Sequence, residues 1–282
     1  INDAGQCLKT QDFQLQDLTK LKKGTLSTFW DFGDSMVSAV ANTTHSYIRI
    51  GNYRIKMIAT SDFGCKDSMN KQVWVNPNSN PSFQINDTGQ CEPNPLFVFQ
   101  STSNIIKGNI VQYVFNLGRN DIRNGFKHSK NYNYTGIENI TMYTYSDSGC
   151  IDSAKRIIQI YPKPKAKMLI NDSAQCVRQN DYLFTNISTD SFGLKNTYWN
   201  LDNNNYTDPN SVNYKFKDTG FKKIVLVQSN VFDCFDTLYK VVYVKPMPDP
   251  AFAKLKTYYC QGNPFETIVP NTPGGVFEGH NM

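Results

Sequence analysis

One seven-residue stretch occurs three times in the chain and constrains the fold more than any other feature. The copies begin at Ile1, Ile85 and Ile170 and read Ile-Asn-Asp-Ala-Gly-Gln-Cys, Ile-Asn-Asp-Thr-Gly-Gln-Cys and Ile-Asn-Asp-Ser-Ala-Gln-Cys. They start 84 and 85 residues apart, which indicates a tandem array of similar units. We predict repeat 1 at 1–77 with a truncated first strand, repeat 2 at 81–162, repeat 3 at 165–246, and an incomplete, different domain at 250–282.

Apolar residues recur at the same offsets from the first cysteine of each repeat. Pairs separated by a single residue are typical of the inward face of a β-strand; these are Phe13 and Leu15, Phe97 and Phe99, and Tyr182 and Phe184. A large aromatic residue follows 23 or 24 positions after the cysteine, as Trp30, Phe115 or Trp199. We interpret these three as core anchors rather than as a carbohydrate-stacking platform. Short strands between turn signals predict one β-sandwich in each repeat.

Charge and hydropathy exclude two classes of partner for this segment. The formal net charge is +5, and the basic residues are scattered rather than gathered on one face, so we expect no nucleic-acid partner. No apolar run approaches the roughly 20 residues of a membrane span, so we expect no span in this segment. Because residue 1 falls inside a repeat, we expect the chain to be an excerpt of a longer polypeptide.

The seven cysteines divide into three pairs and one remaining residue. The two cysteines of each repeat lie 58, 59 and 58 residues apart, and pairing within each copy respects the repeat. This predicts disulfides Cys7–Cys65, Cys91–Cys150 and Cys176–Cys234, with Cys260 unpaired in this chain, and an oxidising compartment. A zinc site is disfavoured because the cysteines lack C-x-x-C spacing.

Asp31 and Asp34 are the strongest candidates in the sequence for a catalytic or metal-binding site. They could form a carboxylate pair or bind calcium, but repeat 2 has Asn116 and Arg119 at these places. We therefore expect turn hydrogen bonds, with calcium in repeat 1 as the alternative. No Gly-rich phosphate loop or nucleophile elbow is present, so we expect no catalytic residues, no cofactor and no enzyme.

Repeat 1 resembles the PKD (polycystic kidney disease) repeat family. The resemblance rests on Trp30-Asp31-Phe32-Gly33-Asp34, His45-Ser46-Tyr47 and Gly51-Asn52-Tyr53, followed by an alternating strand. In repeats 2 and 3 several residue types at these positions differ but their spacing is the same, so we extend the resemblance to all three repeats. It implies an all-β fold of tandem immunoglobulin-like sandwiches, each with one disulfide, in an elongated array.

The sequence after each second cysteine adds to this resemblance. Cys-x-Asp-Ser/Thr-aliphatic looks like PKD repeats of giant Bacteroidetes surface adhesins that the type IX system secretes. Asp-Ser/Thr-aliphatic also resembles the O-glycosylation motif of that phylum; its matches are Ser35, Ser68, Ser153, Ser173 and Thr237. The tail from Tyr259 resembles the opening of another immunoglobulin-like repeat of such proteins.

The resemblance implies a structural or adhesive role outside the cell. We expect a stalk or fibre segment of a large bacterial cell-surface adhesin, used in attachment, gliding or cell–cell contact. Its partners would be neighbouring repeats of the same long chain, surface polysaccharide or other cells. Two alternatives stay open: accessory polysaccharide-binding modules of a secreted hydrolase, and a unit that assembles into a homo-oligomeric filament.

Overall fold

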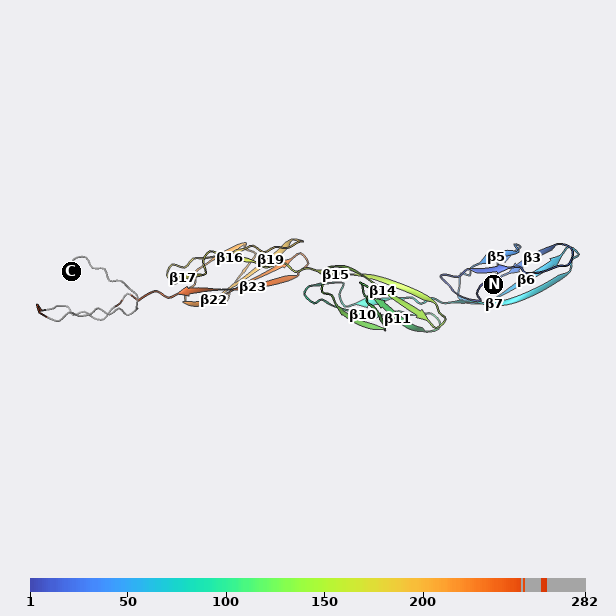
Figure 1. Cartoon of the computed structure of the whole chain (residues 1–282), viewed down its shortest axis with the longest axis horizontal. Coiled ribbons are helices and arrows are strands. Elements are labelled where there is room, and N and C mark those ends of the chain that lie inside the picture. The colour runs from blue at the N-terminus through green and yellow to red at the C-terminus, as the bar shows by residue number, and fades with distance from the viewer. Residues whose placement is uncertain (250, 252–259, 263–282) are drawn as a thin grey trace. The chain divides into compact units, whose positions relative to one another are not determined.

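The computed structural model describes residues 1–249, 251 and 260–262. Every regular element in this part of the chain is a β-strand (Figure 1), and it contains no helix that is long and apolar enough to cross a membrane. The chain divides into two compact units, Ile1–Tyr161 and Pro162–Met282. Most of the different domain expected at 250–282 lies outside the described residues.

Repeat 1 contains one large and one small sheet. The five-stranded sheet has the order β1-β7-β6-β3-β4, and the small sheet pairs β2 with β5. Its strands are β1 (Gly5–Cys7), β2 (Phe13–Gln16), β3 (Leu26–Asp31), β4 (Val37–Ser38), β5 (Asn42–His45), β6 (Gly51–Ser61) and β7 (Lys66–Asn76). A groove of about 440 Å³ lies beside Ile1, Trp30 and Met57.

Repeat 2 has the same arrangement with one strand more. Its sheets have the orders β12-β11-β14-β15-β9 and β13-β10-β8. The strands are β8 (Phe83–Ile85), β9 (Gly89–Cys91), β10 (Leu96–Ser101), β11 (Ile110–Asn116), β12 (Ile122–Asn124), β13 (Lys127–Asn131), β14 (Gly136–Ser146) and β15 (Ile151–Tyr161). The lead-in strand β8 pairs antiparallel with β10.

Repeat 3 follows the plan of repeat 2, with sheets β17-β23-β22-β19-β20 and β16-β18-β21. The strands are β16 (Met168–Ile170), β17 (Ala174–Cys176), β18 (Tyr182–Asn186), β19 (Leu194–Leu201), β20 (Asn204–Thr207), β21 (Ser211–Tyr214), β22 (Gly220–Asn230) and β23 (Phe235–Lys245). The all-β, tandem immunoglobulin-like architecture expected from the sequence is confirmed.

Each repeat buries its own apolar core between its two sheets. The six residues predicted to face inward are at most 2% exposed, and the aromatic anchors Trp30, Phe115 and Trp199 are at most 5% exposed. In repeat 2, Phe83, Phe97 and Phe99 from the small sheet pack in one cluster with Phe115 and Ile140 from the large sheet. The anchors are therefore core residues, as predicted, and not a stacking platform.

The repeated heptapeptide carries the chain from one sheet of each repeat to the other. In repeat 2 it runs from the end of β8, in the small sheet, to the end of β9, in the large sheet. Its asparagine holds the small sheet, since Asn86 Oδ1 accepts from the Val98 backbone N–H at 2.8 Å. Its aspartate makes the corner, since Asp87 Oδ1 accepts from the Gly89 N–H at 3.1 Å. Its glutamine then donates to the Leu96 carbonyl at 3.0 Å.

The same polar contacts recur in the other two copies. Asn2 accepts from Gln14 N–H at 3.1 Å, and Asn171 accepts from Leu183 N–H at 3.0 Å. Gln6 and Gln175 each donate to the carbonyl of the aspartate six residues on, at 3.3 and 3.4 Å, and also accept from its backbone N–H, both at 2.7 Å. The polar residues of the heptapeptide therefore form a turn, in which their side chains make hydrogen bonds with backbone N–H and carbonyl groups.

A buried tyrosine ties the two sheets together in repeats 1 and 2. The Tyr47 hydroxyl donates to the Phe32 carbonyl at 2.8 Å, and the Tyr132 hydroxyl donates to the Leu117 carbonyl at 2.8 Å. Burial, followed by nearby carboxylates and a second tyrosine, raises the pKa of both phenols. Repeat 3 has Phe216 here and lacks the hydroxyl; Asn180 binds the Phe216 N–H and carbonyl at 2.7 and 2.9 Å, as Gln11 binds those of Tyr47 in repeat 1.

We expect Tyr132→Phe to destabilise repeat 2 by about 0.5–1.5 kcal/mol, because it removes one of two hydrogen bonds to the Leu117 carbonyl, which keeps Lys130 Nζ at 3.0 Å. Hydrogen exchange of the β14 and β15 amides in the full chain would measure the loss, with repeat 3 as an internal reference. Tyr143→Phe is the matched control, since Tyr143 is an exposed residue of β14. Equal protection in both variants would contradict the prediction.

Candidate functional site: the disulfide joint between repeats 1 and 2

The two carboxylates singled out in repeat 1 are occupied by turn hydrogen bonds. Asp31 Oδ1 accepts from Gly33 N–H at 2.9 Å, and Asp34 Oδ1 accepts from Met36 N–H at 3.1 Å. The other oxygen of Asp34 lies 2.8 Å from His45 Nε2, and the His45 ring stacks on Phe32. Among the described residues, no group of three or more His, Cys, Asp or Glu side chains could hold a metal ion.

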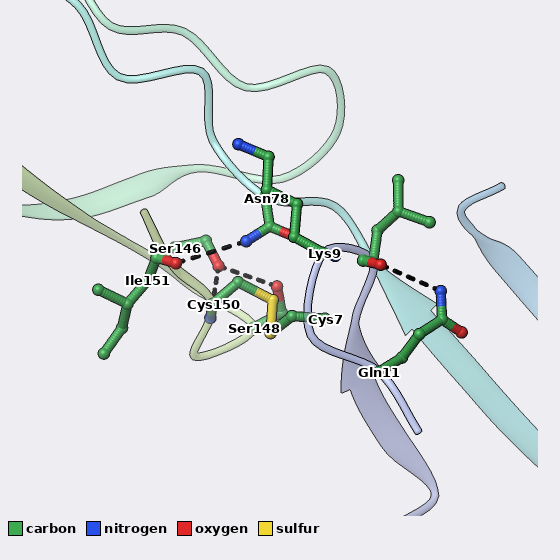
Figure 2. Close-up of a disulfide and its surroundings, with 9 residues drawn as sticks. Cys7, Lys9, Gln11, Asn78, Ser146, Ser148, Cys150 and Ile151 are labelled. Atoms are coloured by element: carbon green, nitrogen blue, oxygen red, sulfur yellow. Dashed lines mark hydrogen bonds between the residues drawn. A yellow bond between two sulfur atoms is a disulfide. The ribbon is translucent and has the colours of Figure 1, made fainter. Parts of the chain in front are cut away.

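The cysteines form a joint between repeats rather than a staple within each repeat. Cys7 of repeat 1 is bonded to Cys150 of repeat 2, with 5.6 Å between their Cα atoms (Figure 2). Cys91 and Cys234 are also disulfide-bonded, whereas Cys65, Cys176 and Cys260 are free and exposed. The predicted pairs Cys7–Cys65, Cys91–Cys150 and Cys176–Cys234 are therefore wrong.

Strand geometry explains why the two cysteines of one repeat cannot meet. The short strand β1 runs parallel to β7 and places Cys7 opposite Asn76, at the last residue of β7. Cys65 immediately precedes β7, and the 11 residue steps from 65 to 76 span roughly 35 Å. Disulfides rarely join Cα atoms more than about 7 Å apart. In the other repeats, the register likewise puts Cys91 opposite Tyr161 and Cys176 opposite Lys245.

Each repeat therefore has one cysteine at either end. We call the end where the chain enters a repeat its proximal end, and the end where the chain leaves it its distal end. The first cysteine lies at the distal end, beside the last residue of the final strand. The second cysteine lies at the proximal end, at the start of that strand. The first cysteine of repeat 1 can thus reach the second cysteine of repeat 2.

The linker residues between the repeats complete the joint. Asn78 accepts from the Lys9 backbone N–H at 3.0 Å and donates to the Ile151 carbonyl at 3.4 Å (Figure 2). Lys9 also forms an ion pair with Asp152. The linker is anchored again by Ser79, a buried residue whose hydroxyl lies 2.6 Å from the Thr144 hydroxyl. A disulfide, an ion pair and a hydrogen-bonded linker thus join repeats 1 and 2.

A tight turn presents Cys150 to its partner. Cys150 N–H donates to Ser146 Oγ at 3.0 Å, and Ser146 N–H donates to the Cys150 carbonyl at 2.9 Å. Gly149, between them, has a φ of 79°, a conformation that glycine adopts without steric cost. Cys150 itself is fully buried. The turn thus fixes the sulfur in a covered position at the proximal end of repeat 2.

The aspartate two residues after the second cysteine anchors the preceding segment in repeat 3 as well. Asp236 accepts from Lys163 Nζ at 2.8 Å and from the Ala166 backbone N–H at 3.0 Å. Burial alone would raise the pKa of the Asp236 carboxyl, but these two hydrogen bonds and the Lys163 charge lower it below the usual value. Asp236 therefore has a structural role in binding the chain that leads into repeat 3, whereas Asp152 binds Lys9 of repeat 1.

The expected glycosylation residues occupy different environments. Ser35, Ser68, Ser153 and Ser173 are exposed, whereas Thr237 is half-buried. In two of the motifs the aspartate accepts from the backbone N–H of the serine itself: Asp67 from Ser68 and Asp152 from Ser153, both at 2.8 Å. Glycosylation stays a prediction.

Sequence reasoning missed the partners of the joint, although two signals for them were present. Pairing the first cysteine of one repeat with the second cysteine of the next also respects the repeat. In addition, an aspartate follows every second cysteine at the same spacing, as Asp67, Asp152 and Asp236. Its recurrence is explained by anchoring at the proximal end in repeats 2 and 3.

Comparison with known proteins finds a family to which repeat 1 is similar. Residues 4–75 match the model of the PKD domain family. The PKD1 domain of the Vibrio cholerae metalloprotease PrtV is 22% identical, with 28% of this chain and 93% of that chain covered and a TM-score of 0.26. The I67–I69 fragment of the titin I-band is 10% identical, with 86% and 95% covered and a TM-score of 0.41.

A Ca²⁺-stabilised adhesin from an Antarctic bacterium that binds ice is 7% identical, with 82% of this chain and 68% of that chain covered and a TM-score of 0.35. None of these three structures reaches a TM-score of 0.5, so they carry no argument about ligand or activity. No curated protein matches the sequence.

Peptide mapping without reduction should recover a cross-linked peptide pair that contains Cys7 and Cys150. Iodoacetamide should modify the exposed thiols of Cys65, Cys176 and Cys260 in the native, unreduced chain and leave Cys150 unmodified. The Cys7→Ser variant is the matched control, because it should release Cys150 for modification on unfolding. A Cys7–Cys65 peptide pair would contradict this connectivity.

Asp236→Asn should lower the thermal stability of the chain at neutral pH, and this difference should disappear as the pH falls below 3.8 and through the lower folded-state pKa of Asp236. Because the folded-state pKa of Asp236 is depressed, its contribution is complete above 3.8 and is lost as the pH falls through the lower folded value. Calorimetry from pH 7 to pH 2 should therefore show the two proteins converge at acid pH. Asp218→Asn, at an exposed aspartate of the same repeat, is the control. A pH-independent difference would contradict the prediction.

Proposed function

We propose that this chain is a non-enzymatic, load-bearing segment of a large bacterial cell-surface adhesin. It serves as part of a stalk or fibre in attachment, gliding or cell–cell contact, of the kind that Bacteroidetes export through the type IX system. The PKD match of repeat 1 and the repetition of the sandwich support this function. The observation that carries it is the disulfide between successive repeats.

A disulfide between repeats changes what tension does to the chain. A force applied along the chain enters repeat 1 near Cys7 and leaves repeat 2 near Cys150. The 143-residue separation between these cysteines contains most of both repeats. While the disulfide is intact, the force passes through the two sulfur atoms and cannot draw out the enclosed strands. The bond thus protects two sandwiches at once, which a staple inside a single repeat would not do.

The oxidised cysteines also support a location outside the cell. Disulfides persist in oxidising compartments and are rare in the reducing cytosol. Cys7, Cys150, Cys91 and Cys234 are all disulfide-bonded. We therefore place the chain at the cell surface, with neighbouring repeats of the same polypeptide as its immediate partners.

Stretching single full-length chains with and without a reductant tests this function. Reduction should add at least about 500 Å of extensible length, because the 143 residue steps from Cys7 to Cys150 extend by up to about 3.3–3.6 Å each and the bonds of Cys91 and Cys234 break as well. The Cys7→Ser variant should extend further than the parent without reductant, but by less than reduction adds, since Cys91 and Cys234 stay bonded; Cys65→Ser, at a free thiol, should behave like the parent chain. An equal extension of parent and Cys7→Ser chains without reductant would overturn the load-bearing role.

A further inference from the structure

Two of the free cysteines occupy the two halves of the joint just described. Cys65 is the second cysteine of repeat 1 and lies at its proximal end, as Cys150 does in repeat 2. Cys176 is the first cysteine of repeat 3 and lies at its distal end, as Cys7 does in repeat 1. Cys150 is buried in its disulfide, whereas Cys65 and Cys176 are exposed.

The backbone around Cys65 already has the conformation that binds a partner at Cys150. Cys65 N–H donates to Ser61 Oγ at 3.2 Å, and Ser61 N–H donates to the Cys65 carbonyl at 2.9 Å. Gly64 has a φ of 81°, against 79° for Gly149 in the bonded copy. The turn at Cys65 in repeat 1 therefore has the same backbone conformation as the turn at Cys150 in repeat 2, which is bonded to Cys7.

The backbone around Cys176 likewise matches that around Cys7. Cys176 lies opposite the last residue of β23, and the next N–H, of Val177, donates to the Lys245 carbonyl at 3.0 Å. The corresponding bond after Cys7 joins Leu8 N–H to the Asn76 carbonyl at 2.9 Å. The distal half of the joint is thus formed in repeat 3 as in repeat 1.

The charges that flank the two free thiols are complementary. In the bonded joint, Lys9, two residues after Cys7, pairs with Asp152, two residues after Cys150. Arg178 stands two residues after Cys176, and Asp67 stands two residues after Cys65. Both side chains are exposed. Contact between the distal end of repeat 3 and the proximal end of a repeat 1 would bring an arginine to an aspartate at the place of the Lys9–Asp152 pair.

We propose that Cys176 and Cys65 are the two halves of a further joint, and that each binds another repeat of this kind. Cys176 forms a disulfide with the second cysteine of a following repeat, and Cys65 forms a disulfide with the first cysteine of a preceding repeat. A second copy of this chain offers both halves, so two copies join head to tail through Cys176 of one and Cys65 of the other. This proposal deepens the proposed function, because it names the partner that continues the array.

Disulfide exchange with a glutathione-type oxidant forms the bond. The Cys176 thiolate attacks oxidised glutathione, forms a mixed disulfide and releases one glutathione. The Cys65 thiolate then attacks the Cys176 sulfur and releases the second glutathione. The two cysteines lose two electrons and two protons, and oxidised glutathione becomes two reduced glutathiones.

The test uses two full-length variants that each keep one half of the joint. Cys65→Ser/Cys260→Ser retains Cys176, and Cys176→Ser/Cys260→Ser retains Cys65. We mix them in a glutathione redox buffer at about millimolar protein, the effective concentration that a short linker provides. Mass spectrometry then counts Cys176–Cys65 heterodimers and the two homodimers. We expect heterodimers in about tenfold excess, equivalent to about 1.4 kcal/mol of preference.

Charge variants decide whether the contact resembles the bonded joint. Asp67→Arg in the Cys65 partner should remove the excess, and Arg178→Asp in the Cys176 partner should restore it. Recovery of the Cys7–Cys150 peptide pair verifies that each variant is folded. The proposal would be overturned if heterodimers make up half of all dimers or less, which is the share expected from random pairing. It would also be overturned if glutathione adducts form without dimers, or if the excess of heterodimers does not respond to the charge swap. None of these outcomes bears on the stretching experiment, so the load-bearing function is tested separately.

Discussion

The short strand of each heptapeptide pairs in parallel with the last strand of its repeat, and this pairing determines where the first cysteine lies. In repeat 1, β1 lies along the end of β7 and carries Cys7 to the distal end, although Cys7 is close to the start of the sequence. The polar residues of the heptapeptide make this crossing between sheets by satisfying the backbone of the corner. Without the crossing, the first cysteine could not reach the following repeat.

The joint between repeats 1 and 2 combines interactions of different strength and kind. The Lys9–Asp152 ion pair is partly exposed, and pairs of that kind contribute about 0–1 kcal/mol. The disulfide closes a much longer loop than a bond within one repeat would, and chain entropy gives about 5 kcal/mol for a loop of that size. The hydrogen bonds of Asn78 and the ion pair orient the repeats, and the covalent bond holds them together.

Differences among the repeats show which parts of this plan are fixed. The corner made by asparagine, aspartate and glutamine and the turn before the second cysteine recur in every repeat. The hydrogen bond of the buried phenol is present in repeats 1 and 2 and absent from repeat 3, where Phe216 stands in place of the tyrosine. The recurring features are those that place the cysteines, and the variable ones stabilise a single core.

The repeat, the strands and the core could be predicted from the amino-acid sequence, because these depend on local periodicity. Phe97, Phe99 and Phe115 were identified as core residues from spacing alone, and all are fully buried. The cysteine connectivity was decided only by the tertiary structure. Both cysteines of repeat 1 flank the same long strand, yet they lie at its opposite ends, and only the strand register shows this. Pairing within a repeat and pairing between repeats have the same periodicity in the sequence, and the length of a β-strand decides between them.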